Sequence, residues 1–387
     1  MPKKFAIVMT ADEKYLPGVN GQLNAYRYYG MEDDGVEFHL VHTIPDSTGY
    51  IHKALKMFPK FVSVKLNDFM IESGRWTKPE KPGKAGMKYP RWWYPAERLA
   101  DYDAICVLDA DRQIVNNFTR HFEMIARSDM IGLAKNDWSD VEWFSYDDKR
   151  AMEANPPIYS NPYFIIGKRA AKLFPLIPEY AENPNKYYPP YKGRDTITGD
   201  MHPVNLTLLQ TGMIKDLFPL EATQWVFVNT AHVRLVRRQV GNRRYIGTHG
   251  KGDLLYTYHR KFWGQRTCER FMNGHTPMER VFGVNNTRIL WEFTKFFNTE
   301  LYLRLPWIYG DFPSNALTRL SANWLDSYIR TGLRNVRAHV LHDDIVGEIA
   351  PILQSEGADR VYRLSDEAID LLAGLGVPVV AALNKQW

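Results

Sequence analysis

An apolar run that ends in two carboxylates, Ile105-Cys106-Val107-Leu108-Asp109-Ala110-Asp111-Arg112, is the most informative part of this sequence. Its apolar half has the length and composition of a buried β-strand. Two acidic residues at positions i and i+2 of an extended chain point to the same side. At the carboxyl end of a parallel strand, where ligands bind in α/β proteins, such a pair can hold one divalent cation. The run predicts a sheet with an Mg²⁺ or Mn²⁺ site at its edge, although a solvated strand end has the same pattern.

The first 134 residues alternate short apolar runs with segments of helical length, which is typical of parallel strands joined by crossover helices. The expected strands lie at 5–9, 37–41, 61–64, 104–108 and 130–133, and a further strand and helix are expected at 163–166 and 168–174. Two proline-rich stretches, 75–91 and 175–190, are expected to be connections. The fold class is therefore α/β.

The composition is that of a folded globular protein. Of 387 residues, 45% are hydrophobic and 24% are charged, which excludes disordered, collagen-like and coiled-coil chains. Two cysteines cannot form a disulfide framework, and every apolar run is far shorter than the roughly 20 residues that a membrane-spanning helix needs. The apolar run near the start is also too short for a signal-peptide core. We therefore expect a cytoplasmic protein without a membrane span.

The chain divides into three expected regions. Residues 1–270 form the main α/β domain, residues 271–332 a helical connecting region, and residues 333–387 a small appendage with the order βαβαβ. Basic charge is concentrated in residues 232–270, which hold ten lysines and arginines against Asp253 and Glu269. An anionic partner would gain from this charge.

Four more stretches lie in a characteristic order around the Asp109-Ala110-Asp111 motif. They are Phe5-Ala6-Ile7-Val8-Met9-Thr10-Ala11-Asp12 with Tyr15, Tyr159-Ser160-Asn161-Pro162-Tyr163-Phe164-Ile165-Ile166, Thr198-Gly199-Asp200-Met201-His202-Pro203-Val204-Asn205-Leu206, and Ile246-Gly247-Thr248-His249-Gly250-Lys251-Gly252. Over roughly residues 5–265, this series resembles the retaining glycosyltransferases of the glycogenin and galactosyltransferase type, family eight. Each motif alone is weak, and the resemblance depends on their order.

The resemblance implies the GT-A fold, a Rossmann-like mixed sheet flanked by helices. It also implies a hexosyl- or pentosyltransferase that depends on Mn²⁺ or Mg²⁺. Such an enzyme moves a sugar from a nucleoside diphosphate sugar, with UDP as the expected nucleotide, and retains the configuration at the anomeric carbon. The implied metal ligands are Asp109, Asp111 and His249. Asp200 and Asn161 would face the transferred sugar as catalytic residues.

The donor is expected to contact the first strand and a set of cations. Nucleotides bind where a strand gives way to a helix, and fixed cations offset the charge of a leaving diphosphate. The expected donor-binding residues are Thr10, Ala11, Asp12, Tyr15, Arg91, Asp109, Ala110, Lys251 and Lys261. Simpler explanations exist, because any one cation can belong to a solvated surface, Asp200 can be a helix N-terminal residue, and Asn161 can be part of a turn.

The sequence departs from the family pattern at three places. Met201 and His202 replace a glutamine and an aspartate, Pro162 stands where serine is common, and the family's Lys-Pro-Trp after the histidine is absent. Lys261-Phe262-Trp263 is a displaced candidate for that tripeptide, which makes His259 the alternative metal ligand to His249. His249 can equally be a loop histidine beside glycines.

The sequence leaves the acceptor and two other classes of protein open. An anionic molecule or a glycan suits the basic segment, and DNA with a modified base is one candidate, because Trp92 and Trp93 offer surfaces for stacking a flipped base. A DNA-binding protein without catalysis would keep the two acids as structural residues. A haloacid-dehalogenase-like phosphatase also begins with a strand and Asp-x-Asp, but Gln113 stands where that family has threonine or valine.

Overall fold

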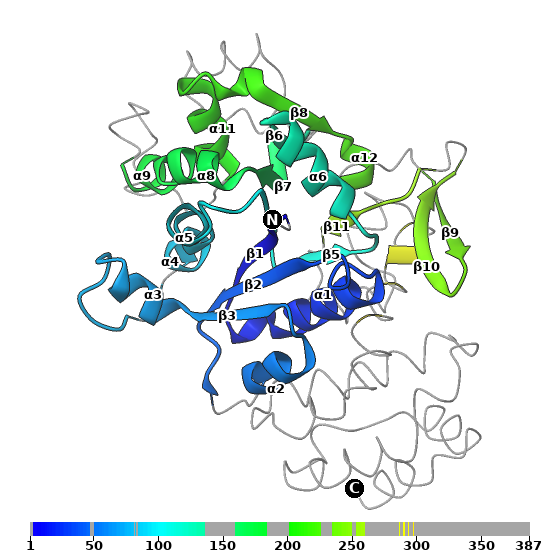
Figure 1. The fold of residues 1–387 in the computed structure, drawn as a ribbon, viewed down its shortest axis with the longest axis horizontal. Coiled ribbons are helices and arrows are strands. Elements are labelled where there is room, and N and C mark those ends of the chain that lie inside the picture. Colours follow the sequence, from blue (N-terminus) through cyan, green and yellow to red (C-terminus); the bar gives the residue numbers. More distant parts are fainter. Residues whose placement is uncertain are drawn as a thin grey trace, which may run out of the picture.

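The computed structural model describes residues 3–46, 50–80, 82, 84–135, 159–183, 201–225, 234–249 and 253–259, together with residues 286, 289, 290, 293 and 297. Its main sheet has seven strands in the order β3-β2-β1-β4-β7-β6-β8 (Figure 1). These strands are β1 (Phe5–Ala11), β2 (Val36–His42), β3 (Phe61–Lys65), β4 (Ala104–Val107), β6 (Ile131–Lys135), β7 (Tyr159–Ile165) and β8 (Leu217–Leu220). β7 pairs antiparallel with β4 and β6, and the other neighbours pair parallel. The expected α/β class, a mixed sheet flanked by helices, is confirmed.

Burial on both faces explains why the apolar runs form strands. In β1 the side chains of Phe5, Ile7 and Met9 join one hydrophobic core, and those of Ala6 and Val8 join the other. Successive side chains of a strand point to opposite faces, so a continuous apolar run suits a strand that is covered on both sides.

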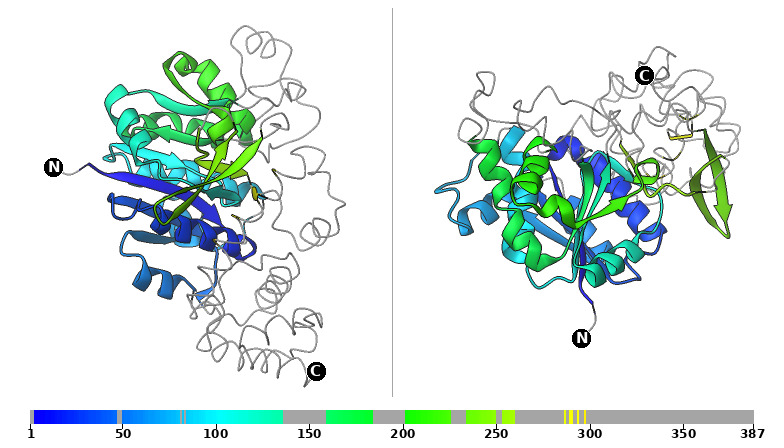
Figure 2. Two further views of the ribbon diagram at one scale, coloured as in Figure 1. Left: turned by 90° about the vertical axis from the view of Figure 1, so that its right-hand side faces the viewer. Right: turned by 90° about the horizontal axis from the view of Figure 1, so that it is seen from above.

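Helices cover each face of the sheet. One core includes buried side chains of α1 (Leu16–Tyr28), α2 (Tyr50–Met57) and α6 (Thr119–Ser128). The other core includes those of α3 (Leu66–Glu72), α5 (Pro90–Arg98), α8 (Gly167–Leu173), α9 (Leu176–Glu182) and α11 (Met201–Gln210). Figure 2 shows the sheet between these two layers. Among the described residues, no helix has the length and hydrophobicity to cross a membrane.

The other described elements are short. They are the 3₁₀ helices η1 (Glu13–Tyr15) and η4 (Met213–Asp216), the helices α4 (Lys84–Lys88) and α12 (Ala222–Trp225), and the strands β5 (Arg112–Ile114), β9 (Leu235–Val240), β10 (Arg243–Thr248) and β11 (Thr257–His259). β9 and β10 form an antiparallel hairpin at the side of the molecule, and β11 pairs antiparallel with β5 (Figure 1).

The strands expected between residues 5 and 166 are all present, with bounds that shift by a few residues, whereas two expected connections are partly wrong. Residues 84–88 and 90–91 belong to α4 and α5, and residues 176–182 form α9. Pro90 stands at the start of α5, where proline costs no hydrogen bond, and Trp92 packs edge-on against Tyr163 and Phe174. This burial, between residues distant in sequence, overrides the loop-like composition. The regions 271–332, apart from the five single residues, and 333–387 lie outside the described residues.

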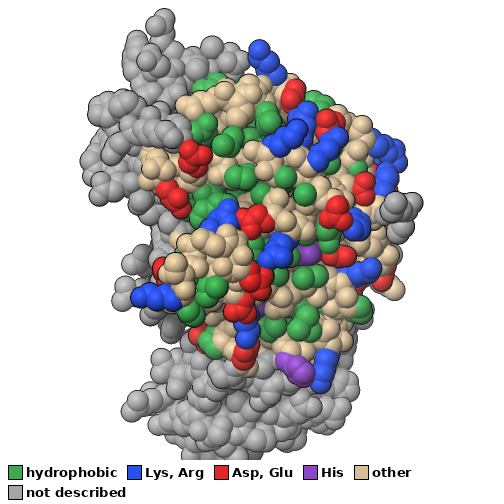
Figure 3. Space-filling model, turned by 60° about the vertical axis from the view of Figure 1, so that its left-hand side comes forward, with side chains coloured by type: hydrophobic (Ala, Val, Ile, Leu, Met, Phe, Trp, Pro, Cys, Tyr) green, Lys and Arg blue, Asp and Glu red, His purple; other side chains and the backbone are tan. Residues whose placement is uncertain are grey.

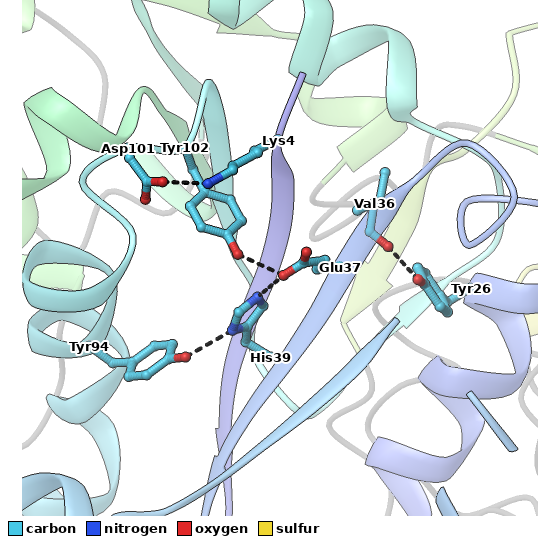
Figure 4. A network of polar contacts seen from close by, with 8 residues as sticks. All are labelled: Lys4, Tyr26, Val36, Glu37, His39, Tyr94, Asp101 and Tyr102. Carbon is cyan, nitrogen blue, oxygen red and sulfur yellow. Dashed lines mark hydrogen bonds and ion pairs between the residues drawn. The ribbon is translucent and has the colours of Figure 1, made fainter. Parts of the chain in front are cut away.

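A polar network joins the amino ends of β1 and β2 to α5 and the segment before β4 (Figure 4). His39 donates from Nε2 to Glu37 at 3.0 Å, and its Nδ1 lies 2.9 Å from the hydroxyl of Tyr94. Tyr102 donates to the same oxygen of Glu37 at 2.6 Å. The hydrogen bond from His39 has the largest effect on the pKa of Glu37 and lowers it. Burial raises this pKa, and the hydrogen bond from Tyr102 lowers it again, to about 2. The network therefore favours the ionised form of Glu37 in the folded state.

We expect this network to stabilise the protein only above acidic pH. The pKa of Glu37 is depressed in the folded state, so its contribution is present above the ordinary value of 4.5 and is lost as the pH falls toward about 2. Glu37→Gln should lower the free energy of unfolding at pH 7 by roughly 1–2 kcal/mol, after allowance for solvent screening of this partly exposed group. It should also flatten the decline in stability between these two pH values, as measured by urea unfolding. Glu72→Gln, at an exposed ion pair with Arg98, is the control and should leave the pH profile unchanged.

Candidate active site

The order of the strands reverses at β1. The chain runs outward from β1 to β2 and β3 and then returns to place β4 on the other side of β1. Val8 lies opposite Val107, and the amide of Leu108 donates to the carbonyl of Val8 at 2.9 Å. The carboxyl ends of β1 and β4 therefore lie side by side at the point where open α/β sheets bind their ligands.

A tight turn beyond β4 carries the two acidic residues. The amide of Arg112 donates to the carbonyl of Asp109 at 3.1 Å, and β5 begins at Arg112. Asp109 and Asp111 are half-buried, whereas Ala110 between them is only 7% exposed. Both acids thus remain accessible to water, while the residue between them packs into the core.

A tyrosine beyond the end of β1 lies in the field of three carboxylates. Tyr15 belongs to η1, directly after Asp12, and is 45% exposed. Burial raises the pKa of Tyr15, and the charges of Asp111, Asp12 and Asp109 raise it further. The ends of β1 and β4 therefore bring four of the predicted site residues together.

A buried arginine binds the first of the two acids. Arg91 of α5 is 3% exposed, and its Nη1 forms an ion pair and a hydrogen bond with Oδ1 of Asp109. The sequence predicted that Arg91 would lie in a loop and bind the donor. It lies instead in a helix against the sheet, and its guanidinium contacts the motif itself.

A second buried arginine follows the motif, and no role was predicted for it. Arg112 is 1% exposed and donates from Nη1 to the carbonyl of Trp225 at 2.9 Å. Burial lowers the pKa of Arg112, whereas the charges of Asp109 and Asp111 raise it. Arg112 and Arg91 thus supply positive charge from inside the protein to a turn that carries two negative charges.

A buried glutamine of α1 contacts the backbone of the same turn. Nε2 of Gln22 lies 3.0 Å from the carbonyl oxygen of Asp109 and 3.2 Å from that of Ala110. The two segments are 87 residues apart in the chain, so no local sequence pattern could have indicated this contact.

Two histidines were candidates for the third metal ligand. His249 follows β10, is exposed, and donates from its amide to the carbonyl of Arg234 at 2.7 Å. His259 ends β11, where its backbone lies opposite Arg112; its side chain lies outside the described part. Among the side chains that the structure describes, no three of His, Cys, Asp and Glu gather closely enough to hold a metal ion. Because His259 pairs with Arg112 between β11 and β5, its backbone lies beside the turn that carries the two acids.

The described residues match a divalent cation in the type of donor atom they offer. Asp109 and Asp111 carry carboxylate oxygens, which are the ligands that Mg²⁺ and Mn²⁺ prefer. Asp12 adds a third negative charge at Tyr15. These acids carry like charges, which a bound cation would offset.

The remaining predicted residues lie at the sheet edge or outside the described part. Thr10 and Ala11 end β1. The backbone of Asn161 lies in β7, and because β7 runs antiparallel to β4, with Tyr163 opposite Val107, the start of β7 adjoins the end of β4. The predicted residues that lie outside the described part are Asp200, Lys251 and Lys261.

Comparison with known proteins gave matches among solved structures only. No family model matches the chain, and no curated protein matches it. The galactosyltransferase LgtC, in complex with donor and acceptor sugar analogs, matches at 14% identity and TM-score 0.43 over 75% of this chain and 95% of that one. The bifunctional glycosyltransferase WbbM matches at 10% identity and TM-score 0.42 over 58% of this chain, which spans 40% of WbbM. Mouse xyloside xylosyltransferase 1 matches at 13% identity and TM-score 0.41 over 67% of this chain and 98% of that one.

These matched structures are all glycosyltransferases. Their similarity to this chain is low, and it does not by itself assign an activity or a site residue.

The ion pair of Arg91 should make the two acids unequal in their effect on stability. Asp109→Asn leaves the buried guanidinium without its carboxylate, and we expect the free energy of unfolding to fall by about 2 kcal/mol, less than for a fully buried pair. Asp111→Asn leaves the ion pair between Arg91 and Asp109 in place and should cost less than half as much. Urea unfolding in the presence of a chelator measures both. Adding Arg91→Met to Asp109→Asn should recover part of the loss, whereas equal losses for the two single variants would contradict the assigned ion pair.

Proposed function

We propose that this protein is a metal-dependent glycosyltransferase that moves a sugar from a nucleoside diphosphate sugar, with UDP as the nucleotide, to an acceptor with retention of configuration. One observation carries the proposal: the ends of β1 and β4, which are followed by Asp12 and Tyr15 and by Asp109 and Asp111, lie side by side at the point where the strand order reverses. The ordered series of motifs in the sequence supports the same function. Carboxylates placed at a nucleotide-binding edge suit a diphosphate that is bound through a divalent cation.

In this proposal, Asp109 and Asp111 hold Mn²⁺ or Mg²⁺, and His249 or His259 completes the ligand set. A divalent cation bound there supplies positive charge that stabilises the departing diphosphate. Thr10, Ala11, Asp12 and Tyr15, at the end of β1, bind the base and ribose of the donor.

Arg91 has two roles in this proposal. Its guanidinium fixes the carboxylate of Asp109, and its charge, from a buried position, favours an anion at the same edge of the sheet. Lys251 and Lys261 add further positive charge for the leaving diphosphate. Asp200 and Asn161 contact the transferred sugar, and the position of Asn161 at the start of β7 suits this role.

Asp111→Asn provides the direct test of the proposed activity. It removes one metal ligand without breaking the ion pair of Arg91, so we expect the metal-dependent rise in melting temperature with UDP-sugars to disappear and donor hydrolysis to fall at least 100-fold. Thermal shift with UDP-, GDP-, ADP- and dTDP-sugars, with and without Mn²⁺, identifies the donor. Asp68→Asn, on the exposed side of α3, is the control.

Two outcomes would contradict this function. Undiminished donor hydrolysis by the Asp111→Asn variant would show that the acid is not a metal ligand. Release of inorganic phosphate from a phosphomonoester, with no response to any nucleotide sugar, would favour a phosphatase.

We further propose that the acceptor is anionic, and the hairpin of β9 and β10 supports this choice. Residues 234–249 contain five arginines and no acidic residue, and all five arginines are exposed. The hairpin is fixed to the end of α1, where Tyr29 donates to the carbonyl of Arg244 at 2.8 Å. On the face shown in Figure 3, by contrast, lysines and arginines lie among aspartates and glutamates. A hairpin with charge of one sign is suited to a phosphate-rich or acidic polymer.

Neutralising this hairpin should weaken binding to a polyanion. For Arg237→Gln combined with Arg238→Gln, we expect the affinity for a fluorescein-labelled DNA duplex to fall about tenfold. The slope of log affinity against log salt concentration should decrease by the equivalent of roughly two phosphate contacts. Fluorescence anisotropy over a salt series measures both, and a sulfated glycan serves as the second probe. Arg98→Gln combined with Arg127→Gln removes the same charge from other exposed positions. Equal effects of the two double variants would show that net charge, and not the hairpin, attracts the polymer.

A further inference from the structure

Gln22 has a contact pattern that the proposed chemistry does not yet explain. It lies in the middle of α1 and is fully buried. Its Nε2 approaches the carbonyl oxygens of two consecutive residues, Asp109 and Ala110, at 3.0 and 3.2 Å. Both are backbone groups of the turn that carries the two acids.

The orientation of the amide follows from its neighbours. A glutamine amide has two N–H donors and one oxygen, and two carbonyl oxygens are satisfied only by the donors. The reverse orientation would place the oxygen of Gln22 against the oxygens of Asp109 and Ala110. In a buried position, each carbonyl left without a donor costs about 1–3 kcal/mol.

The turn is therefore held from two sides. Gln22 of α1 binds its backbone from one face of the sheet, and Arg91 of α5 binds the carboxylate of Asp109 from the other. The amide of Arg112 closes the turn on the carbonyl of Asp109. With its backbone and a side chain both bonded, the turn has little freedom to change the separation of its two carboxylates.

We propose that Gln22 is a positioning residue, which fixes the backbone of the turn so that Asp109 and Asp111 present their carboxylates at a set separation. The proposal rests on the proposed function for its consequence, because the separation matters to a bound cation. Residues that orient metal ligands without touching the metal typically change metal affinity 10- to 100-fold when they are replaced. Gln22 would act in that way through the backbone.

Gln113 provides a matched control for Gln22. It is also fully buried, and its Nε2 also donates to two carbonyls, those of Gly21 at 3.2 Å and of Ile114 at 2.8 Å. The side-chain oxygens of both glutamines are buried without a hydrogen-bond partner in the described part of the chain. The two residues thus share burial and bonding, and they differ in that only Gln22 contacts the acidic turn.

The experiment compares Gln22→Leu with Gln113→Leu, each in the full chain. Both variants should lose similar thermal stability, because each removes a buried amide that donates to two carbonyl oxygens. Amide hydrogen exchange in the peptide that spans 109–112 is measured without metal, and only Gln22→Leu should speed it, by at least tenfold. Mn²⁺ binding is measured by calorimetry, and only Gln22→Leu should weaken it, by 10- to 100-fold.

Each outcome decides one of the two proposals. If exchange in this peptide and Mn²⁺ affinity respond alike to both variants, Gln22 is a structural residue and the positioning role is wrong, while the glycosyltransferase proposal is unaffected. If the unmodified protein binds neither Mn²⁺ nor a nucleotide sugar, the proposed function fails. Faster exchange in Gln22→Leu alone would still show that Gln22 fixes the turn.

Discussion

The buried guanidinium of Arg91 against the carboxylate of Asp109 is the interaction on which the site depends most. A buried arginine is costly unless it is paired, so α5 can pack against the sheet only if an acid meets it there. That acid is the first residue of the motif, which fixes the motif to the helix layer. Asp109 is therefore both part of the fold and part of the proposed binding site.

The arrangement of the strands explains why the motif can be held from both faces. At β1 the strand order reverses, so α1 leaves to one side of the sheet and the α5 layer covers the other. The turn after β4 lies between these layers and receives Gln22 from one and Arg91 from the other. A site built in this way is rigid because its supports belong to the hydrophobic cores, and rigid supports are what a metal or diphosphate site requires.

Sequence patterns predicted those features that depend on local periodicity. The apolar runs predicted the strands between residues 5 and 166, and the acids that follow one of these runs lie just beyond the end of β4. The start of α5 was missed because its lysine-, proline- and glycine-rich approach resembles a loop, and the burial of Trp92 depends on residues far away in the chain. The contact of Gln22 could not be predicted for the same reason, because local composition does not indicate a contact between residues that lie 87 positions apart.

The surroundings of the carboxylates differ between the two ends of the strands. At the amino ends, Glu37 accepts hydrogen bonds from His39 and Tyr102, and its ionised form is favoured. At the carboxyl ends, burial and then the charges of three carboxylates raise the pKa of Tyr15 and oppose its ionisation. Like charges at the ends of β1 and β4 repel one another, and local rules of stability are broken most often where a protein binds something. A cation that binds only the folded state would relieve the repulsion and stabilise the fold by mass action, so stability and ligand binding are linked at this turn.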